Sequence, residues 1–296
     1  MATPTVSLFT PPHLDPEPSA VQFTMNPDGI TTIGINRMHK KNSIDPLTAR
    51  KLHTAFLAFD NEPSQKVCVL HGIGGTFCSG FDLSDIENWD MDATTASSSS
   101  SNSPNQQQQQ QGGITRKQFP PVTGLNPGPL GPTRLHLTKP VICAISGFAV
   151  AGGLELAAIA DLRVVDSDAK FGVFNRRLGV PLLDGLTIRL PALIGLGRAL
   201  DLILTGRTVD AAEALSIGLV NRVVTPGTAF EEAMRLARTL AAFPQEGMRA
   251  DRASVYYGVY EAGSLGDGLS REYEGAMEVA DLAIGRALRF ARGSKL

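Results

Sequence analysis

Two glycine-rich segments offer backbone N–H groups that could bind a developing negative charge. One is Phe77-Cys-Ser-Gly-Phe-Asp-Leu83, and the other is Ile145-Ser-Gly-Phe-Ala-Val-Ala-Gly-Gly-Leu-Glu-Leu156. A strand that stops at glycines and runs into a helix leaves backbone N–H groups without intrahelical acceptors. Two such groups that converge on one point form an oxyanion hole. Either segment alone is a weak signal, because glycine turns are common.

One acidic side chain, Glu155, follows Gly152 closely in the second segment. Its neighbours Leu154, Leu156 and Ala157 are apolar, so burial would raise the pKa of the carboxyl towards neutral pH. A carboxyl with such a pKa suits general acid/base catalysis. The alternative is a glutamate that only favours the dipole of a helix N-terminus. We predict that Glu155 exchanges protons with a substrate.

The elements that must position these residues come in the order strands first, helices afterwards. Alternating apolar residues at 21–25 and 30–35 flank the turn Asn26-Pro-Asp-Gly29, which predicts a β-hairpin. Asp45 suits the N-cap and Pro46 the first position of a helix through Phe59. Further strands are expected at 67–71, 141–145, 162–165 and 170–173, and helices at 154–159, 197–204, 211–217, 230–242 and 268–292. This order indicates a mixed α/β fold with a helical C-terminal unit.

The composition excludes several classes of partner. The 27 basic and 29 acidic side chains give a net charge of −2 without any polybasic block, so a nucleic-acid partner is not expected. The longest apolar run, residues 141–160, is interrupted by glycines and Glu155, so no membrane span is expected. The three cysteines, Cys68, Cys78 and Cys143, form no CxxC pair and favour a reducing compartment. No Cys/His cluster with metal-ligand spacing is present, so no metal is expected.

Composition also divides the chain. Residues 1–20 are expected to form a disordered tail, and residues 21–222 the core. Residues 90–131 contain runs of serine and glutamine and read as a low-complexity surface insertion into that core. Residues 223–293 are expected to form a C-terminal helical region. The last three residues, Ser294-Lys295-Leu296, match the tripeptide that a peroxisomal import receptor reads, so a peroxisomal location is expected.

Together the two glycine-rich segments, in this order, closely resemble the signatures of the crotonase (enoyl-CoA hydratase/isomerase) superfamily. The resemblance covers roughly residues 21–292, excluding the insertion, and includes Ile35-Asn-Arg37 and Phe171-Gly-Val-Phe-Asn-Arg-Arg-Leu-Gly179. It implies a ββα spiral core with a C-terminal helical trimerisation region. It also implies a homotrimer or hexamer, an acyl-CoA substrate, and no cofactor beyond the coenzyme A of that substrate.

Carried over to this chain, the resemblance makes the backbone N–H groups of Phe81 and Gly152 the oxyanion donors and Glu155 the acid/base. Family hydratases with two glutamates place the second where this chain has Asn175, and an amide cannot exchange a proton at neutral pH. Asp184 lies in the next turn and is a candidate second catalytic carboxylate. A plain turn residue before Gly185 is the alternative for Asp184.

The resemblance also implies coenzyme A contacts. Arg37, Lys40 and Lys41 would meet the ADP phosphates, although a solvated basic face is the rival interpretation of the lysines. The backbone around Asp82 and Leu83 would lie near adenine and pantetheine. The C-terminal helix around Phe290 would cover the coenzyme.

We therefore expect reversible hydration of a 2-enoyl-CoA, in which Glu155 handles water and Asn175 orients it. An enoyl-CoA or dienoyl-CoA isomerase that uses Glu155, Asp184 or both is the alternative. A non-catalytic acyl-CoA binder is a third hypothesis from a different class. The sequence leaves acyl chain length, branching and pathway open.

Overall fold

A six-stranded sheet forms the centre of the computed structural model, which describes residues 15–84 and 121–291. Its strand order is β1 (Val21–Met25), β2 (Ile30–Ile35), β3 (Val67–Gly72), β4 (Val141–Ile145), β6 (Leu162–Asp166) and β9 (Arg222–Val224). Only the β1–β2 pair is antiparallel, and all other neighbours run parallel. The parallel strands are nearly continuous apolar runs because helices cover both faces of the sheet.

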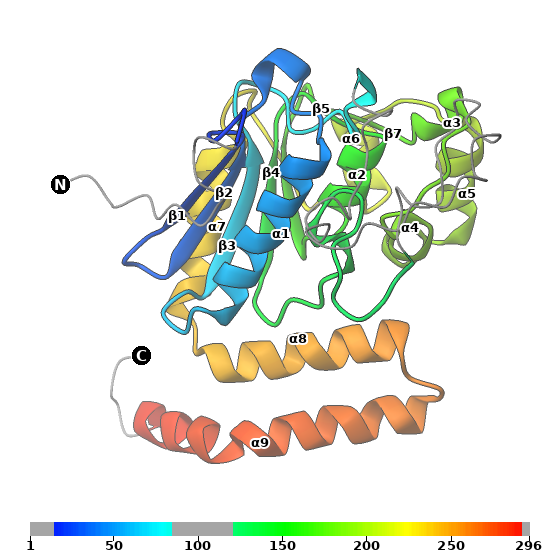
Figure 1. Cartoon of the computed structure of the whole chain (residues 1–296). Coiled ribbons are helices and arrows are strands. Elements are labelled where there is room, and N and C mark those ends of the chain that lie inside the picture. Colours follow the sequence, from blue (N-terminus) through cyan, green and yellow to red (C-terminus); the bar gives the residue numbers. More distant parts are fainter. Residues whose placement is uncertain (1–14, 85–120, 292–296) are drawn as a thin grey trace, which may run out of the picture.

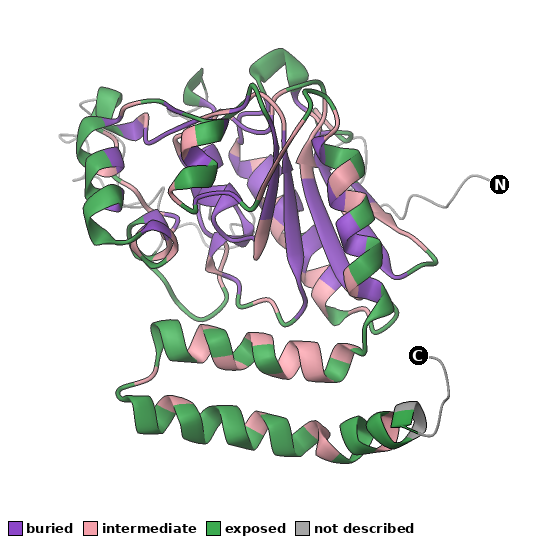
Figure 2. Ribbon diagram, turned by 180° about the vertical axis from the view of Figure 1, so that it is seen from behind, coloured by how far each residue is buried: buried purple, intermediate pink, exposed green. Residues whose placement is uncertain are grey.

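The expected hairpin and first helix are both present. Gly29 has a φ of 82° in the turn between β1 and β2, a conformation that glycine adopts without strain. Helix α1 (Pro46–Asn61) begins after Asp45, whose side chain accepts a hydrogen bond from the backbone N–H of Thr48. Figure 1 shows α1 on one face of the sheet and α7 (Ala229–Ala242) on the other. The strands and the inner sides of these helices form the buried centre in Figure 2.

A second, three-stranded sheet carries one of the glycine-rich segments. Its order is β5 (Phe148–Val150), β7 (Lys170–Gly172) and β8 (Val209–Asp210). Helices α2 (Gly152–Ala157) and α6 (Ala211–Ser216) pack on its strands. The other short helices are η2 (Met38–Lys40), η5 (Pro132–Arg134), α3 (Asn175–Leu178), α4 (Leu186–Ile194) and α5 (Leu196–Thr205). The chain thus leaves β4, forms β5 and enters α2 within a few residues, which fixes the start of α2 beside both sheets.

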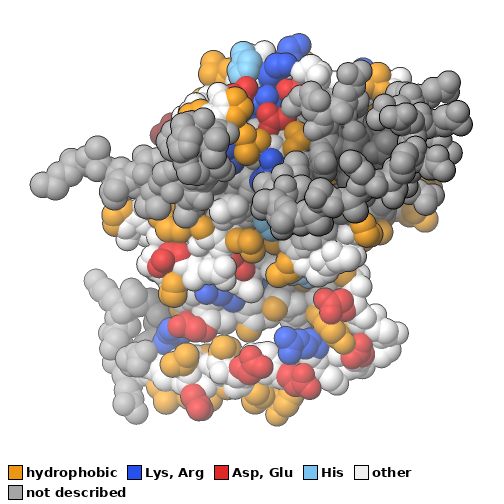
Figure 3. All heavy atoms as spheres, viewed as in Figure 1, with side chains coloured by type: hydrophobic (Ala, Val, Ile, Leu, Met, Phe, Trp, Pro, Cys, Tyr) orange, Lys and Arg blue, Asp and Glu red, His pale blue; other side chains and the backbone are white. Residues whose placement is uncertain are grey.

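The last two helices, α8 (Gln245–Tyr260) and α9 (Leu265–Ala291), form an antiparallel hairpin beside the rest of the molecule (Figure 1). No residue of α8, all of which the structure describes, is buried. Polar contacts attach it instead: Arg252 and Tyr256 both reach Oδ1 of Asp161 at 2.9 Å. Hydrophobic side chains are interspersed with charged ones over this hairpin in Figure 3.

Three of the predicted boundaries need correction. Residues 15–20 are not a free tail, because Asp15 is buried and forms an ion pair with Lys51 of α1. The insertion does not extend to residue 131, because Leu130 is fully buried and Gly131 lies against the backbone of Ala49. The boundary between residues 222 and 223 falls inside β9.

Other expectations fall on residues that the structure does not describe. These are residues 1–14, the low-complexity part of the insertion at 85–120, and the tripeptide 294–296. Among the residues that are described, none of the helices has both the length and the apolar character needed to cross a bilayer.

Candidate active site

The two glycine-rich turns lie side by side. The N–H of Cys78 donates to the carbonyl of Phe148 at 2.9 Å, and the N–H of Val150 donates back to Cys78 at 3.2 Å. Gly80 has a φ of 100°, and a Cβ atom there would lie 2.9 Å from the backbone nitrogen of Gly152. Gly80 is therefore required for the close contact of the two backbones, and so is Gly153, where a Cβ atom would overlap the carbonyl oxygen of Cys78.

The predicted oxyanion donors belong to these touching turns. Phe81 follows Gly80 and is fixed from both sides, because the N–H of Ile44 donates to Gly80 and the N–H of Asp82 donates to Ile44. Gly152 is the first residue of α2, where N–H groups have no intrahelical acceptor. The convergence of the Phe81 and Gly152 N–H groups on one oxygen stays a prediction.

Glu155 is fully buried on α2, one turn beyond Gly152. Its Oε2 accepts hydrogen bonds from the backbone N–H groups of Asp184 at 2.9 Å and Leu186 at 3.4 Å. Among the described residues, none donates to its Oε1. Burial, and after it the nearby charge of Asp184, raise the pKa of Glu155 to about 8.

Asp184 is the second buried carboxylate of the site. Its Oδ1 accepts from the hydroxyl of Thr133 and from the N–H of Leu130, whereas no described residue donates to its Oδ2. Burial raises the pKa of Asp184 to about 6, although the bonds from Thr133 and Leu130 act in the opposite direction. The negative charge of Asp184 opposes the ionisation of Glu155, which favours one proton on the pair of carboxyls at neutral pH.

Asn175 begins α3 and is also buried. Its Oδ1 has no hydrogen-bond partner in the part of the chain that the structure describes. An amide offers both a donor and an acceptor, so this side chain can orient a bound polar group without changing its charge.

A cavity of about 320 Å³ lies at the two turns. Phe81, Ala151 and Asn175 contribute to its wall, and so do Lys41, Leu83 and the apolar side chains Phe148, Val150, Phe174, Leu178 and Val180. The cavity ends one helical turn before Glu155, whose backbone N–H donates to the carbonyl of Ala151. Its wall is therefore mostly apolar and includes Phe81 and Asn175, whereas Gly152, Glu155 and Asp184 lie outside the lining.

Among the predicted coenzyme A contacts, Arg37 needs correction. It is 3% exposed, and its guanidinium forms ion pairs with Glu17, Asp45 and Asp82 at 2.6, 2.9 and 3.1 Å. Because all three nitrogens of this guanidinium already serve the three carboxylates and the carbonyl of Ser43, Arg37 does not fit the role of a phosphate ligand. Asp82 is buried in the same network, so only its backbone remains a candidate contact.

The remaining coenzyme contacts stay predictions. Lys41 and Leu83 line the cavity, and Leu83 is 50% exposed. Lys40 is exposed and donates to the hydroxyl of Ser84 at 2.7 Å. Phe290 belongs to α9, but its side chain lies outside the described residues.

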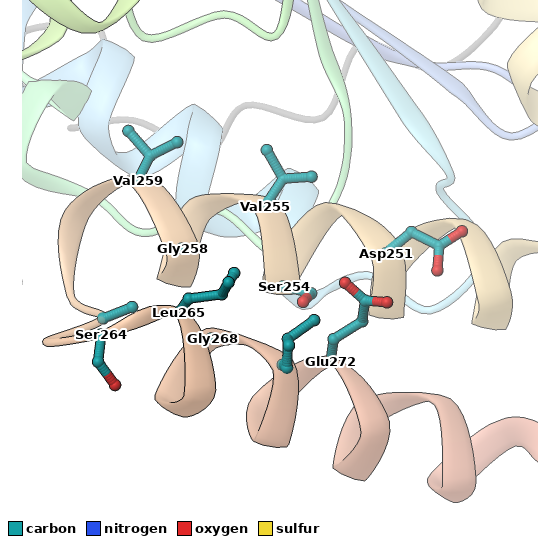
Figure 4. Close-up of a pocket in the computed structure, with 11 residues that line it drawn as sticks. Asp251, Ser254, Val255, Gly258, Val259, Ser264, Leu265, Gly268 and Glu272 are labelled. Carbon is teal, nitrogen blue, oxygen red and sulfur yellow. The ribbon is translucent and has the colours of Figure 1, made fainter.

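A larger cavity of about 620 Å³ lies elsewhere, between α8 and α9 (Figure 4). Figure 4 shows Val255 and Val259 of α8 above Leu265 of α9, with Asp251 and Glu272 at one end. Asn175 and residues of both glycine turns line the smaller cavity but not this one, and neither cavity is lined by Glu155 or Asp184, so size alone would identify the wrong site.

Metal and thiol chemistry receive no support at the turns. Within residues 15–84 and 121–291, no three His, Cys, Asp or Glu side chains come together as they would around a metal ion. Cys78 is fully buried, and burial raises the pKa of its thiol to about 12, which keeps it protonated.

Sequence reasoning missed Thr133, Leu130 and Arg189. Arg189 donates to the carbonyls of Asp184 at 2.9 Å and Thr133 at 2.7 Å, which ties the two loops together. Thr133 and Leu130 border a stretch that composition marks as an insertion. The only available signal was the Gly-Pro-Leu-Gly-Pro-Thr sequence at 128–133, where an apolar residue stands between conformationally restricted ones.

Comparison with known proteins identifies the family of the chain. The profile of the family described as enoyl-CoA hydratase/isomerase matches residues 25–114 and 133–260. The chain is 33% identical over 217 residues to enoyl-CoA hydratase EchA19 of Mycobacterium tuberculosis, which covers 71% of this chain and 70% of the relative. It is 30% identical to crotonyl-CoA hydratase of Syntrophomonas wolfei, with 78% of this chain and 79% of the relative covered.

Solved structures show the same likeness. The crystal structure of enoyl-CoA hydratase EchA1 from Mycobacterium marinum superposes with a TM-score of 0.74 at 28% identity, covering 92% of this chain and 96% of the other. A second structure, of enoyl-CoA hydratase from Mycobacterium tuberculosis, also gives a TM-score of 0.74, at 29% identity and with the same coverage. The fold class expected from the two motifs is confirmed.

Proposed function

Because the chain belongs to the enoyl-CoA hydratase/isomerase family, the crotonase superfamily of acyl-CoA enzymes, we propose that it hydrates a 2-enoyl-CoA reversibly through Glu155 and Asp184. The hydratase names of its relatives support water addition. The observation that carries the assignment to these residues is that both carboxyls are buried together: Glu155 lies one turn beyond Gly152 on α2, and its Oε2 accepts from the backbone N–H of Asp184.

The thioester carbonyl would lie at the turns of Phe81 and Gly152. As the carbonyl oxygen gains negative charge, each N–H that donates to it contributes about 3 kcal/mol. The same charge develops whether water adds or leaves, so these donors serve both directions of the reaction.

The proton transfers use both carboxylates. The ionised member takes a proton from water, the water oxygen bonds to C3, and the electron pair of the double bond moves to the thioester as an enolate. The protonated member then gives its proton to C2, which restores the carbonyl. Asn175, whose Oδ1 has no donor among the described residues, orients the water. In this scheme Asp184 replaces the second glutamate that the sequence lacks at position 175.

The test is turnover in heavy-oxygen water. The purified protein is given a panel of 2-enoyl-CoA, 3-hydroxyacyl-CoA and dienoyl-CoA thioesters, and the products are weighed by mass spectrometry. Hydration predicts products that carry one heavy oxygen at C3. Double-bond migration without any gain of oxygen would overturn the proposal.

Isomerisation is the second candidate, and Asn175 is the observation that favours it. An amide in place of the family's second glutamate leaves the chain without an acid at that position, and an isomerase needs only one group to move a proton between carbons. This alternative predicts exchange of substrate hydrogen with deuterated solvent and no uptake of oxygen. The exchange should be lost in Asp184→Asn.

Three finer features belong to this proposal. Lys40, Lys41 and Leu83 would bind coenzyme A at the mouth of the cavity. The hairpin of α8 and α9, with hydrophobic side chains on its exposed faces, would join three copies of the chain into a trimer or a hexamer. Ser294-Lys295-Leu296 would direct the protein to the peroxisome. Fluorescent fusions with and without this tripeptide test the location, and sedimentation tests the assembly.

A further inference from the structure

The segment 128–134 contacts both halves of the active site. The backbone N–H of Leu130 donates to Oδ1 of Asp184 at 3.1 Å. The side chain of the same residue packs on the other half, since a Cβ atom on Gly152 would lie 2.8 Å from Leu130 Cδ1. One short segment therefore packs on an oxyanion glycine and also binds a catalytic carboxylate.

Thr133 makes the most direct contact with Asp184. It is 2% exposed, and its hydroxyl donates to the same Oδ1 that Leu130 reaches. Gly128 allows this approach, because a Cβ atom there would lie 2.1 Å from Thr133 Oγ1 and 2.7 Å from Asp184 Oδ1. An oxygen that accepts two hydrogen bonds is held in the ionised form, whose lone pairs both donors use.

The charged groups around Asp184 come from three other positions. Glu155 on α2 opposes its ionisation by like charge, while Arg134 on η5 and Arg189 on α4 favour it. Arg189 also donates to the carbonyls of both Thr133 and Asp184, which fixes the distance between them. His53 on α1 lies at the carbonyl of Gly131, 3.3 Å from its Nδ1, on the other side of the segment.

We propose that Thr133 is a positioning residue that keeps Asp184 ionised, so that the single proton of the carboxyl pair resides on Glu155. This inference rests on the proposed function in one respect, namely that both carboxylates take part in the reaction. The ionisation of Asp184 itself can be measured without any substrate.

The experiment compares Thr133→Val, which is nearly isosteric and lacks the hydroxyl, with Thr133→Ser, which retains it. Carboxyl titrations are followed by carbon-13 NMR of labelled protein, with Asp184→Asn used to assign the signal. Loss of the hydroxyl removes a donor to the ionised form, so the pKa of Asp184 rises, by about one unit or more in Thr133→Val. Thr133→Ser should titrate like the wild type.

Kinetics give a second readout. With an enoyl-CoA substrate, the acid limb of the kcat profile should move to higher pH in Thr133→Val, with KM unchanged. A merely structural role would lower kcat equally at every pH. Thr133→Ala serves in the same way if the valine variant does not fold.

The outcomes separate the two claims. An Asp184 titration that is the same in wild type, Thr133→Val and Thr133→Ser overturns the positioning role, even if the enzyme hydrates enoyl-CoA. A raised Asp184 pKa in Thr133→Val, together with no turnover by the wild type on any enoyl-CoA, supports the positioning role and overturns the proposed function.

Discussion

Replacing Glu155 by glutamine should abolish catalysis and stabilise the fold at the same time. Folding raises the pKa of Glu155 from its ordinary 4.5 to about 8, because the ionised form is buried. A folded-state pKa above the unfolded value means that the folded protein loses stability as the pH rises from about 4.5 to about 8. Glutamine does not ionise, so the Glu155→Gln variant does not lose stability over this pH range.

The size of the effect follows from the two pKa values. The difference between 4.5 and about 8 corresponds to about 5 kcal/mol at 1.36 kcal/mol per unit, an upper value because Asp184 shares the proton. Urea unfolding at about pH 5 and about pH 9 should show a stability advantage of Glu155→Gln that is small at the first and several kcal/mol at the second. The kcat should fall about 10²- to 10⁴-fold, the usual contribution of general acid/base catalysis.

A matched control is Glu274→Gln, because Glu274 is an exposed glutamate of α9 far from both turns. It should change neither kcat nor the pH dependence of unfolding. A Glu155→Gln variant with wild-type kcat would contradict the acid/base role of Glu155. A stability difference that is equal at the two pH values would refute the raised pKa of Glu155.

Four further predictions concern other residues of the site and its surroundings. Asp184→Asn should lower kcat. It should also move the alkaline limb of the pH profile to lower pH, because the negative charge that raises the pKa of Glu155 is gone. Initial rates between about pH 5 and about pH 10 measure this shift. Gly80→Ala places a Cβ atom 2.9 Å from the Gly152 nitrogen and requires a φ of 100°, so kcat should fall about 10²-fold or more, measured beside thermal unfolding. Arg37→Met leaves three carboxylates facing one another and should cost about 3–5 kcal/mol of stability in urea unfolding. Lys41→Ala should raise the KM for acyl-CoA and leave stability unchanged.

Local patterns were enough to predict much of the core. The β1–β2 hairpin, the N-cap of α1 and the buried strands β3 and β4 each leave a signal within a few consecutive residues. Helix α8 was not predicted as a separate element because Gly247, Gly258 and several charged residues interrupt its apolar ones, which weakens the helical repeat. Helix α4 was missed because it contains Pro191 and is apolar on most sides, which hides its period.

The residues of the candidate site also could be predicted only in part. Glu155 could be found from its apolar neighbours and its place after Gly152, all within one turn of helix. The bond between Thr133 and Asp184 joins residues 51 positions apart, so no local pattern predicts it. Arg37 was misassigned because a sequence shows the charge of an arginine but not the three carboxylates that surround it after folding.

The pH dependence of kcat/KM for enoyl-CoA hydration tests the shared proton of Glu155 and Asp184 most directly. One ionised and one protonated carboxyl predict a bell-shaped profile, with an acid limb near pH 6 and an alkaline limb near pH 8. A rate that rises through a single limb near pH 4.5, the ordinary value of a glutamate, and stays level above it would contradict the account.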